Sequence, residues 1–457
     1  MKHSLLLMLL LGTIQLTAQV DATSESHELT LQEAIDYGLE NNYQAINARR
    51  EIAKALKQKW ETTATGLPQI DGSAGYNYNI EIPVTPLPAR IVDPMAPEGQ
   101  FVGVEFATRQ TANLNATLNQ LIFDGSYLVA LEASKTFLEF SQNSNSKTKL
   151  EVRKGIINAY GGVLLTQENI AIIESNLEVL QKNVDETTAI FENGLAEEED
   201  VEQLKITLLQ IKNQLANAQR QEQIAMDMLK LALGMPLDHV LILEEELTAL
   251  AMENLNLEVA GETLQMDMNL DYRIARNFSE QRRLEYKLEQ SKALPRLSAF
   301  INYGVNAFDE DFVFLDSGTQ WFDQSTVGVN LTVPLFSSFG RKAAQDRTRL
   351  AWNQAETDLQ RVQEEVRLQY ESAVNQYQNA VDGYTTSSDN LRLAQRIENK
   401  NQIKFKEGLA TSFELRQAQT QLYATQSQYL QSLYSLITEK ANIETIRNTP
   451  GYIKDTK

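Results

Sequence analysis

The chain contains no cysteine among its 457 residues. Disulfides, thiolate metal sites and thiol catalysis are therefore excluded, and so is the lipidated cysteine that anchors a lipoprotein. After residue 18 the sequence also lacks any run of about 18 apolar residues, so no transmembrane helix is expected. If the chain enters a membrane, it must do so as strands, and a soluble periplasmic helical protein is the alternative.

Positive charge is scarce as well. Lys and Arg number 41 against 61 Asp and Glu, which gives a formal net charge of −20. Such a chain is poorly suited to phosphate backbones, so we expect no nucleic-acid partner. His3 belongs to the amino-terminal segment, and His27 and His239 lack ligand spacing, so we expect no metal or other cofactor. The sequence shows no phosphate loop, HExxH motif or nucleophile elbow, which argues against an enzyme.

The amino terminus has the features of a secretory signal. A basic start, Met1-Lys2-His3, precedes the apolar run from Leu5 to Leu11, and Thr17-Ala18 is a plausible cleavage point. We therefore interpret residues 1–18 as a signal peptide and exclude them from the fold.

Proline is absent from two long stretches, between Ser126 and Phe191 and between Gly340 and Phe405. Each stretch predicts a helix of about 65 residues, roughly 100 Å long at 1.5 Å per residue. Shorter helices are predicted at about residues 31–62, 197–233, 263–292 and 411–447. Apolar residues spaced alternately by four and three predict coiled-coil seams, at Ile173, Leu177, Leu180 and Val184, and at Leu204, Leu208, Ile211, Leu215 and Ala218.

The sequence is repeated. Leu67-Pro68 returns as Leu294-Pro295, and the segment from Phe191 to Ala196 returns as the segment from Phe405 to Ala410. Tandem copies in the same order predict two structural repeats, which we assign to residues 19–240 and 241–457.

Four segments alternate with the period of a strand, at about residues 70–80, 110–123, 297–307 and 325–336. One side of each is apolar or small, and the other carries Ser, Thr, Asn and Gly, with Asp71 as its charge and Phe300 as its large exception. Segments of about 10 residues with this pattern are typical of strands that cross a bilayer. The alternative is an ordinary amphipathic sheet, whose polar face usually carries Lys and Glu.

Four strands per chain cannot close a barrel, and open sheet edges are unstable in hydrocarbon. We therefore expect several chains to share one barrel under cyclic symmetry. A dimer would give eight strands and a filled interior, whereas a trimer gives twelve and begins to leave a lumen. A conducting protein favours the trimer.

Taken together, these parts resemble the TolC-like outer-membrane efflux proteins over nearly all of the chain after the signal. The resemblance is carried by Leu29–Ile35 ahead of Asn41-Asn42, by the two Leu-Pro strand entries, by Gln120–Gly125 and Val333–Phe336 at the strand exits, and by the two Gly-Leu pairs. It implies a mainly α trimer that shares a 12-stranded outer-membrane barrel and continues as a long helical tunnel across the periplasm.

Both Gly-Leu pairs lie between predicted helices, where a helix hairpin needs glycine in any case. In the family, matching tips meet the hairpins of a periplasmic adaptor. The resemblance therefore implies docking by residues at both tips: Gly194, Leu195, Ala196, Gly408, Leu409, Ala410 and Thr411. The first tip departs from the family pattern, because it carries Glu197 where the second carries Thr411.

A carboxylate follows each tip glycine by six residues, Asp200 in the first copy and Glu414 in the second. Family members have acidic residues near this position that narrow the closed tunnel entrance, so we expect both to form an entrance constriction. The alternative is that these acids only offset the dipole at a helix start.

The expected function is therefore a passive outer-membrane exit duct of a tripartite efflux system. Its expected partners are two further copies of the chain, a periplasmic adaptor, an inner-membrane pump of RND or ABC type, and outer-membrane lipid. Alternatives are a duct for type I protein secretion and a non-conducting periplasmic scaffold. Aromatic residues in the second copy could form an interfacial belt or a loop-packing cluster, namely Phe308, Phe312, Phe314, Trp321 and Phe322.

Overall fold

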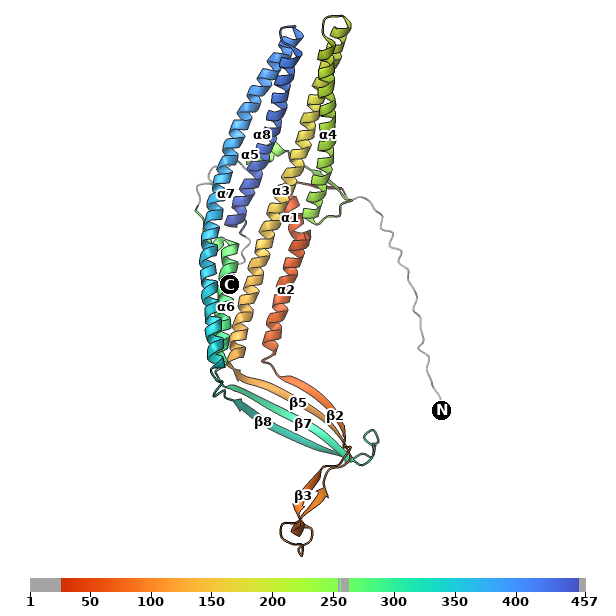
Figure 1. The fold of residues 1–457 in the computed structure, drawn as a ribbon, viewed down its shortest axis with the longest axis vertical. Helices are drawn as coiled ribbons and strands as arrows, with labels where there is room; N and C mark the ends of the chain where they lie inside the picture. Colours follow the sequence, from red (N-terminus) through yellow and green to blue (C-terminus); the bar gives the residue numbers. More distant parts are fainter. Residues whose placement is uncertain (1–25, 254, 256–262, 452–457) are drawn as a thin grey trace, which may run out of the picture. The chain divides into compact units, whose positions relative to one another are not determined.

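The computed structural model describes residues 26–253, 255 and 263–451 (Figure 1), so the expected signal segment lies outside the described residues. The chain forms two compact units. We call residues 43–154, 255, 263–383 and 438–451 the sheet unit, and residues 26–42, 155–253 and 384–437 the tip unit. Each unit therefore draws on both halves of the sequence.

The sheet unit contains a four-stranded antiparallel sheet (Figure 1). Its strands, in spatial order, are β2 (Gln69–Tyr78), β5 (Gln110–Asp124), β7 (Arg296–Asp309) and β8 (Trp321–Thr332). The last strand begins and ends about four residues earlier than the alternation indicated. It stops short of Pro334, whose nitrogen has no hydrogen to donate to a ladder. β2 and β8 form the two edges of this sheet.

The two faces of the sheet differ in chemistry. Cross-strand partners such as Leu118 and Ile301, or Ile301 and Val327, place the apolar residues of all four strands on one face. This apolar face is exposed over much of its length, with Ile70 73% and Val327 76% exposed. The opposite face carries Asn, Ser and Thr side chains, including an amide of Asn302 that donates to the Thr117 hydroxyl at 2.7 Å.

Glycines on the polar face make room for larger cross-strand neighbours. Phe300 pairs with Gly328, and a Cβ on Gly328 would lie 2.6 Å from the Phe300 ring. The same relation holds between Gly75 and the opposing Asn113. The large exception on the polar side is therefore accommodated by the glycine opposite it.

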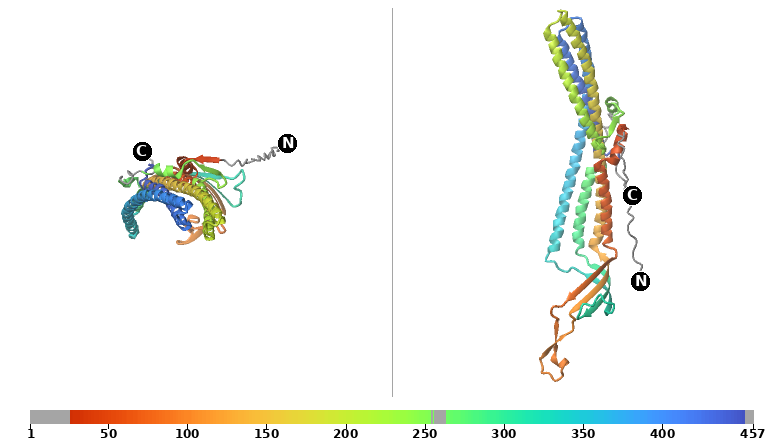
Figure 2. Two further views of the ribbon diagram at one scale, coloured as in Figure 1. Left: turned by 90° about the horizontal axis from the view of Figure 1, so that it is seen from above. Right: turned by 90° about the vertical axis from the view of Figure 1, so that its right-hand side faces the viewer.

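Beyond β2 the chain forms a separate hairpin of β3 (Val84–Pro88) and β4 (Phe101–Glu105), which projects past the end of the sheet (Figure 2). At the same end, Phe314 and Trp321 pack on Ala112 and Ala307 of the apolar face. Tyr76 contacts Phe314 edge-on, with ring centroids 5.9 Å apart. Phe312, Phe314 and Trp321 are thus part of a packing cluster on the apolar face. Phe308 and Phe322 contact each other on the opposite, polar face, where their register partners are Thr111 and Asn306.

Helices of the sheet unit are α2 (Tyr43–Ala64) and α6 (Leu270–Ser291), together with parts of α3 (Gly125–Glu192), α7 (Gly340–Lys406) and α8 (Ser412–Arg447). α6 begins at Leu270, later than expected, because the Asn269 side chain caps it by accepting from the Tyr272 amide at 3.0 Å. A short 3-10 turn, Met266–Met268, precedes it.

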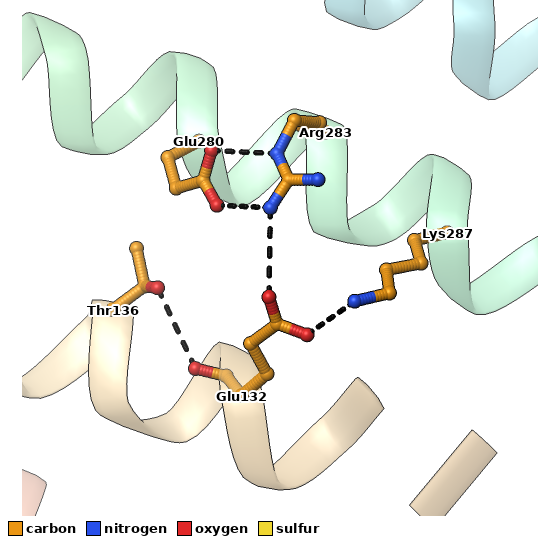
Figure 3. Close-up of polar contacts among 5 residues, drawn as sticks. All are labelled: Glu132, Thr136, Glu280, Arg283 and Lys287. Carbon is orange, nitrogen blue, oxygen red and sulfur yellow. Dashed lines mark hydrogen bonds and ion pairs between the residues drawn. The ribbon is translucent and has the colours of Figure 1, made fainter. Parts of the chain in front are cut away.

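Ion pairs join α3 to α6 (Figure 3). The Glu132 carboxylate of α3 accepts a hydrogen bond from Lys287 at 2.5 Å and lies 3.5 Å from the Arg283 guanidinium. Arg283 also donates two hydrogen bonds to Glu280. The hydrogen bond from Lys287 lowers the pKa of Glu132. Four alternating charges therefore hold the two helices at this level.

The tip unit contains a parallel pair of short strands, β1 (Ser26–Leu29) and β6 (Val240–Leu243), with α1 (Leu31–Asn41) and α5 (Leu247–Glu253) beside it in the sequence. The expected helix at 31–62 is divided at Asn42, whose backbone leaves the helical region and whose side-chain amide donates to the Ala232 carbonyl at 2.8 Å. α1 starts with a capping box of Thr30 and Glu33, and Glu245 also accepts from the Leu31 amide.

The remainder of the tip unit is α4 (Glu198–Leu233) packed with the outer parts of α3, α7 and α8. The predicted seams are confirmed, because Leu180 and Val184 of α3 form one buried cluster with Leu204, Leu208 and Ile211 of α4. Among the described residues, no helix combines the length and the apolar composition that a membrane crossing requires.

Candidate functional site

The turn between α3 and α4 is the first hairpin tip, and the turn between α7 and α8 is the second. The two tips have the same backbone conformation. Gly194 ends α3 with φ +76°, and Gly408 ends α7 with φ +69°. The following amides bond back into each helix, Leu195 to Ile190 at 3.0 Å and Leu409 to Lys404 at 2.7 Å. There is open space for a Cβ at both positions, but a positive φ strains the backbone of any residue that has one. This left-handed helix ending therefore favours glycine. The sequence-predicted tips are therefore turns of one design.

Both turns present an apolar side chain to the outside. Leu195 is 81% exposed and Leu409 77%, so neither caps its own hairpin by packing. Ala196 and Ala410 are half-buried, and Thr411 is exposed. Phe413, on the first turn of α8, is also exposed and lies under the Arg416 guanidinium at 5.4 Å. The tips thus offer apolar contacts that the chain itself leaves unused.

The helices that follow the tips start differently. Thr411 and Glu414 form a capping box, in which the Glu414 amide donates to the Thr411 hydroxyl at 3.2 Å and the Thr411 amide donates to the Glu414 carboxylate at 2.8 Å. These bonds, the backbone one first, lower the pKa of Glu414. At the first tip Glu197 occupies the cap position without a side-chain cap bond. The departure at Glu197 therefore removes a cap.

Asp200 has a different kind of partner. Its carboxylate accepts from the hydroxyl of Ser412, the first residue of α8, so it reaches the other hairpin. Arg416 donates to Gln203 nearby, and Lys406 lies 3.8 Å from Glu186. The structure therefore places Asp200 in a link between the two hairpins, while Glu414 engages the start of its own helix.

The sequence did not point to Ser412, Gln203 or Arg416, because a contact between helix starts in different repeats has no local signal. It also did not reveal Glu398 of α7, which is only 7% exposed. Burial raises the pKa of this carboxyl, and burial likewise raises the pKa of Tyr423 on α8 to about 12. The tip unit therefore contains a buried acid below its exposed turns.

The two histidines that are distant in sequence meet in the tip unit. His27 and His239 stack with ring centroids 5.8 Å apart and ring planes 7° from parallel. Stacked rings share a face instead of converging on one ion. Within the described ranges, no three His, Cys, Asp or Glu residues are grouped as metal ligands.

Comparison with known proteins gives a consistent result. The family model described as "Outer membrane efflux protein" matches residues 34–235 and 268–449. The outer membrane protein TolC of Vibrio cholerae is 22% identical over 334 residues, which are 72% of this chain and 70% of that protein.

Solved structures with the same fold include VceC of Vibrio cholerae, with a TM-score of 0.69 and 16% identity over 91% of this chain and 95% of that one. The CmeC outer membrane channel of Campylobacter jejuni gives a TM-score of 0.72 and 16% identity over 93% and 87%. The family model matches the chain in two segments, which are separated by residues 236–267.

Proposed function

The chain belongs to the outer membrane efflux protein family, and from that premise we propose that it is the passive exit duct of a tripartite efflux system. It is an outer-membrane protein whose helical part lies in the periplasm. In the proposed role it performs no chemistry. Substrates enter from an adaptor and an inner-membrane pump and diffuse through a polar lumen to the exterior.

The four-stranded sheet carries this proposal. One face is apolar and exposed, which suits lipid, and the other is lined by small polar side chains, which suits a water-filled interior. The outward-facing backbone N–H and C=O groups of the edge strands β2 and β8 must be hydrogen-bonded if the sheet lies in hydrocarbon. Pairing β8 of one copy with β2 of the next closes a barrel, and three copies supply twelve strands with room for a lumen.

We assign adaptor docking to the tips, at Gly194, Leu195, Ala196, Gly408, Leu409, Ala410 and Thr411. The exposed leucines support this assignment, because an apolar side chain that is 77% or 81% exposed gains most from a partner surface. The helix after the second tip also has a capping box, which the helix after the first tip lacks.

The entrance constriction is assigned to Asp200 and Glu414. The link from Asp200 to Ser412 supports a closed arrangement, because it ties the two hairpins together. Substituting Asp200→Asn should weaken the link and raise channel conductance. Glu198→Gln is the matched control, an exposed acid in the same helical turn. Equal conductance of the two variants and the parent would remove Asp200 from the entrance.

Conductance of the purified protein in planar bilayers tests the duct itself. A well-folded trimer without channel activity would defeat the proposal and favour a periplasmic scaffold. Crosslinking in cells, followed by pull-down and mass spectrometry, tests the partners. Gly408→Trp should lose the adaptor and pump, whereas Gly318→Trp, in the β7–β8 loop with open space at its Cβ, should retain them. The recovered pump distinguishes drug efflux from type I protein secretion.

A further inference from the structure

A cavity of about 440 Å³ lies in the sheet unit where strands give way to helices. Its apolar wall is formed by Phe123 at the end of β5, Leu128 in the first turns of α3, and Leu294 just after α6. All three side chains are exposed. Its far end is polar and is formed by Glu132 and Lys287. The cavity therefore runs from an apolar opening to an ion pair.

A β-bulge places the apolar opening on the apolar face of the sheet. In the register of β5 and β7, Leu121 pairs with Ser298, and the next pair is Phe123 with Leu297. The shift at Ile122 moves Phe123 to the same face as Leu297, Ala299 and Ile301. The cavity is therefore continuous with the surface that faces lipid in the proposed barrel.

The distance between the two ends suits a lipid headgroup. Leu128 of the apolar wall and Glu132 of the polar end are four residues apart in α3, which is about 6 Å along the helix. The headgroup layer of a bilayer adds about 5–8 Å on each side of the hydrocarbon core. A lipid whose chain lies on Phe123 and Leu128 would thus bring its headgroup to the ion pair.

The charges at that end are balanced (Figure 3). Glu132 and Glu280 alternate with Arg283 and Lys287, and the two cations offset the two carboxylates. A net anionic headgroup would gain from Lys287 but meet Glu132 beside it. A zwitterionic headgroup can place its phosphate on Lys287 and its ammonium on Glu132, both through charge-assisted hydrogen bonds.

We propose that this junction cavity, between the end of β5 and the helices α3 and α6, binds one zwitterionic aminophospholipid of the periplasmic leaflet. The inference rests on the proposed function, since it requires the sheet to lie in the membrane. Bound lipid fills the exposed apolar wall and fixes the height at which the helices leave the bilayer.

Native mass spectrometry of the full-length protein, with added dioleoyl phosphatidylethanolamine or dioleoyl phosphatidylglycerol, tests the proposal. We expect the ethanolamine lipid to bind more tightly than the glycerol lipid of the same chains. Lys287→Gln should weaken its binding about tenfold, equivalent to about 1.4 kcal/mol. Lys292→Gln is the matched control, since Lys292 follows the end of α6, pairs with Glu289 and does not line the cavity.

A second variant tests the apolar wall, because Leu128 is exposed and Leu128→Gln is expected to fold. It should also weaken lipid binding. An excess of soluble glycerophosphoethanolamine should not displace the lipid, since the chains contribute to binding. Displacement by the soluble headgroup, equal binding of both lipids, or parent-like binding by both variants would overturn the proposal.

The same samples are tested for conductance. A conducting trimer without lipid selectivity defeats this inference alone, whereas a parent protein that neither conducts nor forms trimers defeats the proposed function. A photocrosslinker at Leu128 adds an independent result. A lipid adduct supports the site, and an adduct to a second copy of the chain overturns it.

Discussion

Leu204→Ala tests whether the seam between α3 and α4 holds the tip unit together. Leu204 is 1% exposed and lies in the cluster with Leu180, Val184, Leu208 and Ile211. Removing three buried carbon groups costs about 2.4 kcal/mol at about 0.8 kcal/mol each. The cavity left among rigid neighbours adds to this, so we expect a loss of about 3 kcal/mol per chain.

Hydrogen exchange measured by mass spectrometry on peptides of α3 and α4 reports the opening of this hairpin locally. A loss of about 3 kcal/mol should speed exchange there by more than about a hundredfold. Leu209→Ala is the control, because Leu209 is on the same helix but 66% exposed, and it should change exchange little. Similar exchange in the two variants would refute the reasoning that the buried seam stabilises the hairpin.

Two glycines should respond to alanine with opposite signs in the same exchange measurement. Gly383 lies within α7 with open space for a Cβ, so Gly383→Ala should stabilise the helix by about 1 kcal/mol. Gly408 has φ +69°, which is unfavourable for alanine, so Gly408→Ala should destabilise the turn by about 1–2 kcal/mol. Equal signs would contradict the assigned backbone of the tip. Glu398→Gln should remove a pH dependence of the folding stability. Burial raises the pKa of Glu398 in the folded state, so the folded state keeps a proton that the unfolded state has lost. The parent therefore loses stability as the pH rises from the ordinary carboxyl pKa through the raised one. The variant should therefore be the more stable at pH 7, with the difference vanishing below the ordinary pKa. A difference that does not change with pH would place Glu398 in water.

Much of this architecture follows from local rules in the sequence. The long helices have no internal proline, and the seams have the spacing that buries Leu180 against Leu204. The alternating segments are strands because their two faces meet different surroundings. The tip glycines were identifiable because only glycine takes a left-handed helix ending at low cost.

Other features depend on residues far away in the chain. The break at Asn42 is fixed by a bond to Ala232, and the sequence around Asn42 continues a helical pattern. The link between Asp200 and Ser412 joins helix starts from different repeats. Neither contact leaves a periodic signal, and tertiary context overrides local propensity at both sites.

The first strand has a consequence for how the protein is made. β1 pairs with β6, and the Glu245 carboxylate accepts from the first amide of α1, so the beginning of the described chain depends on residues at and just after the end of the first repeat. In a chain exported amino end first, these partners arrive late, and such non-local pairing is slow. β1 therefore stays unpaired until the first long hairpin has been exported and β6 follows it. Slow export would lengthen the time during which other proteins or a protease can bind the unpaired β1 segment.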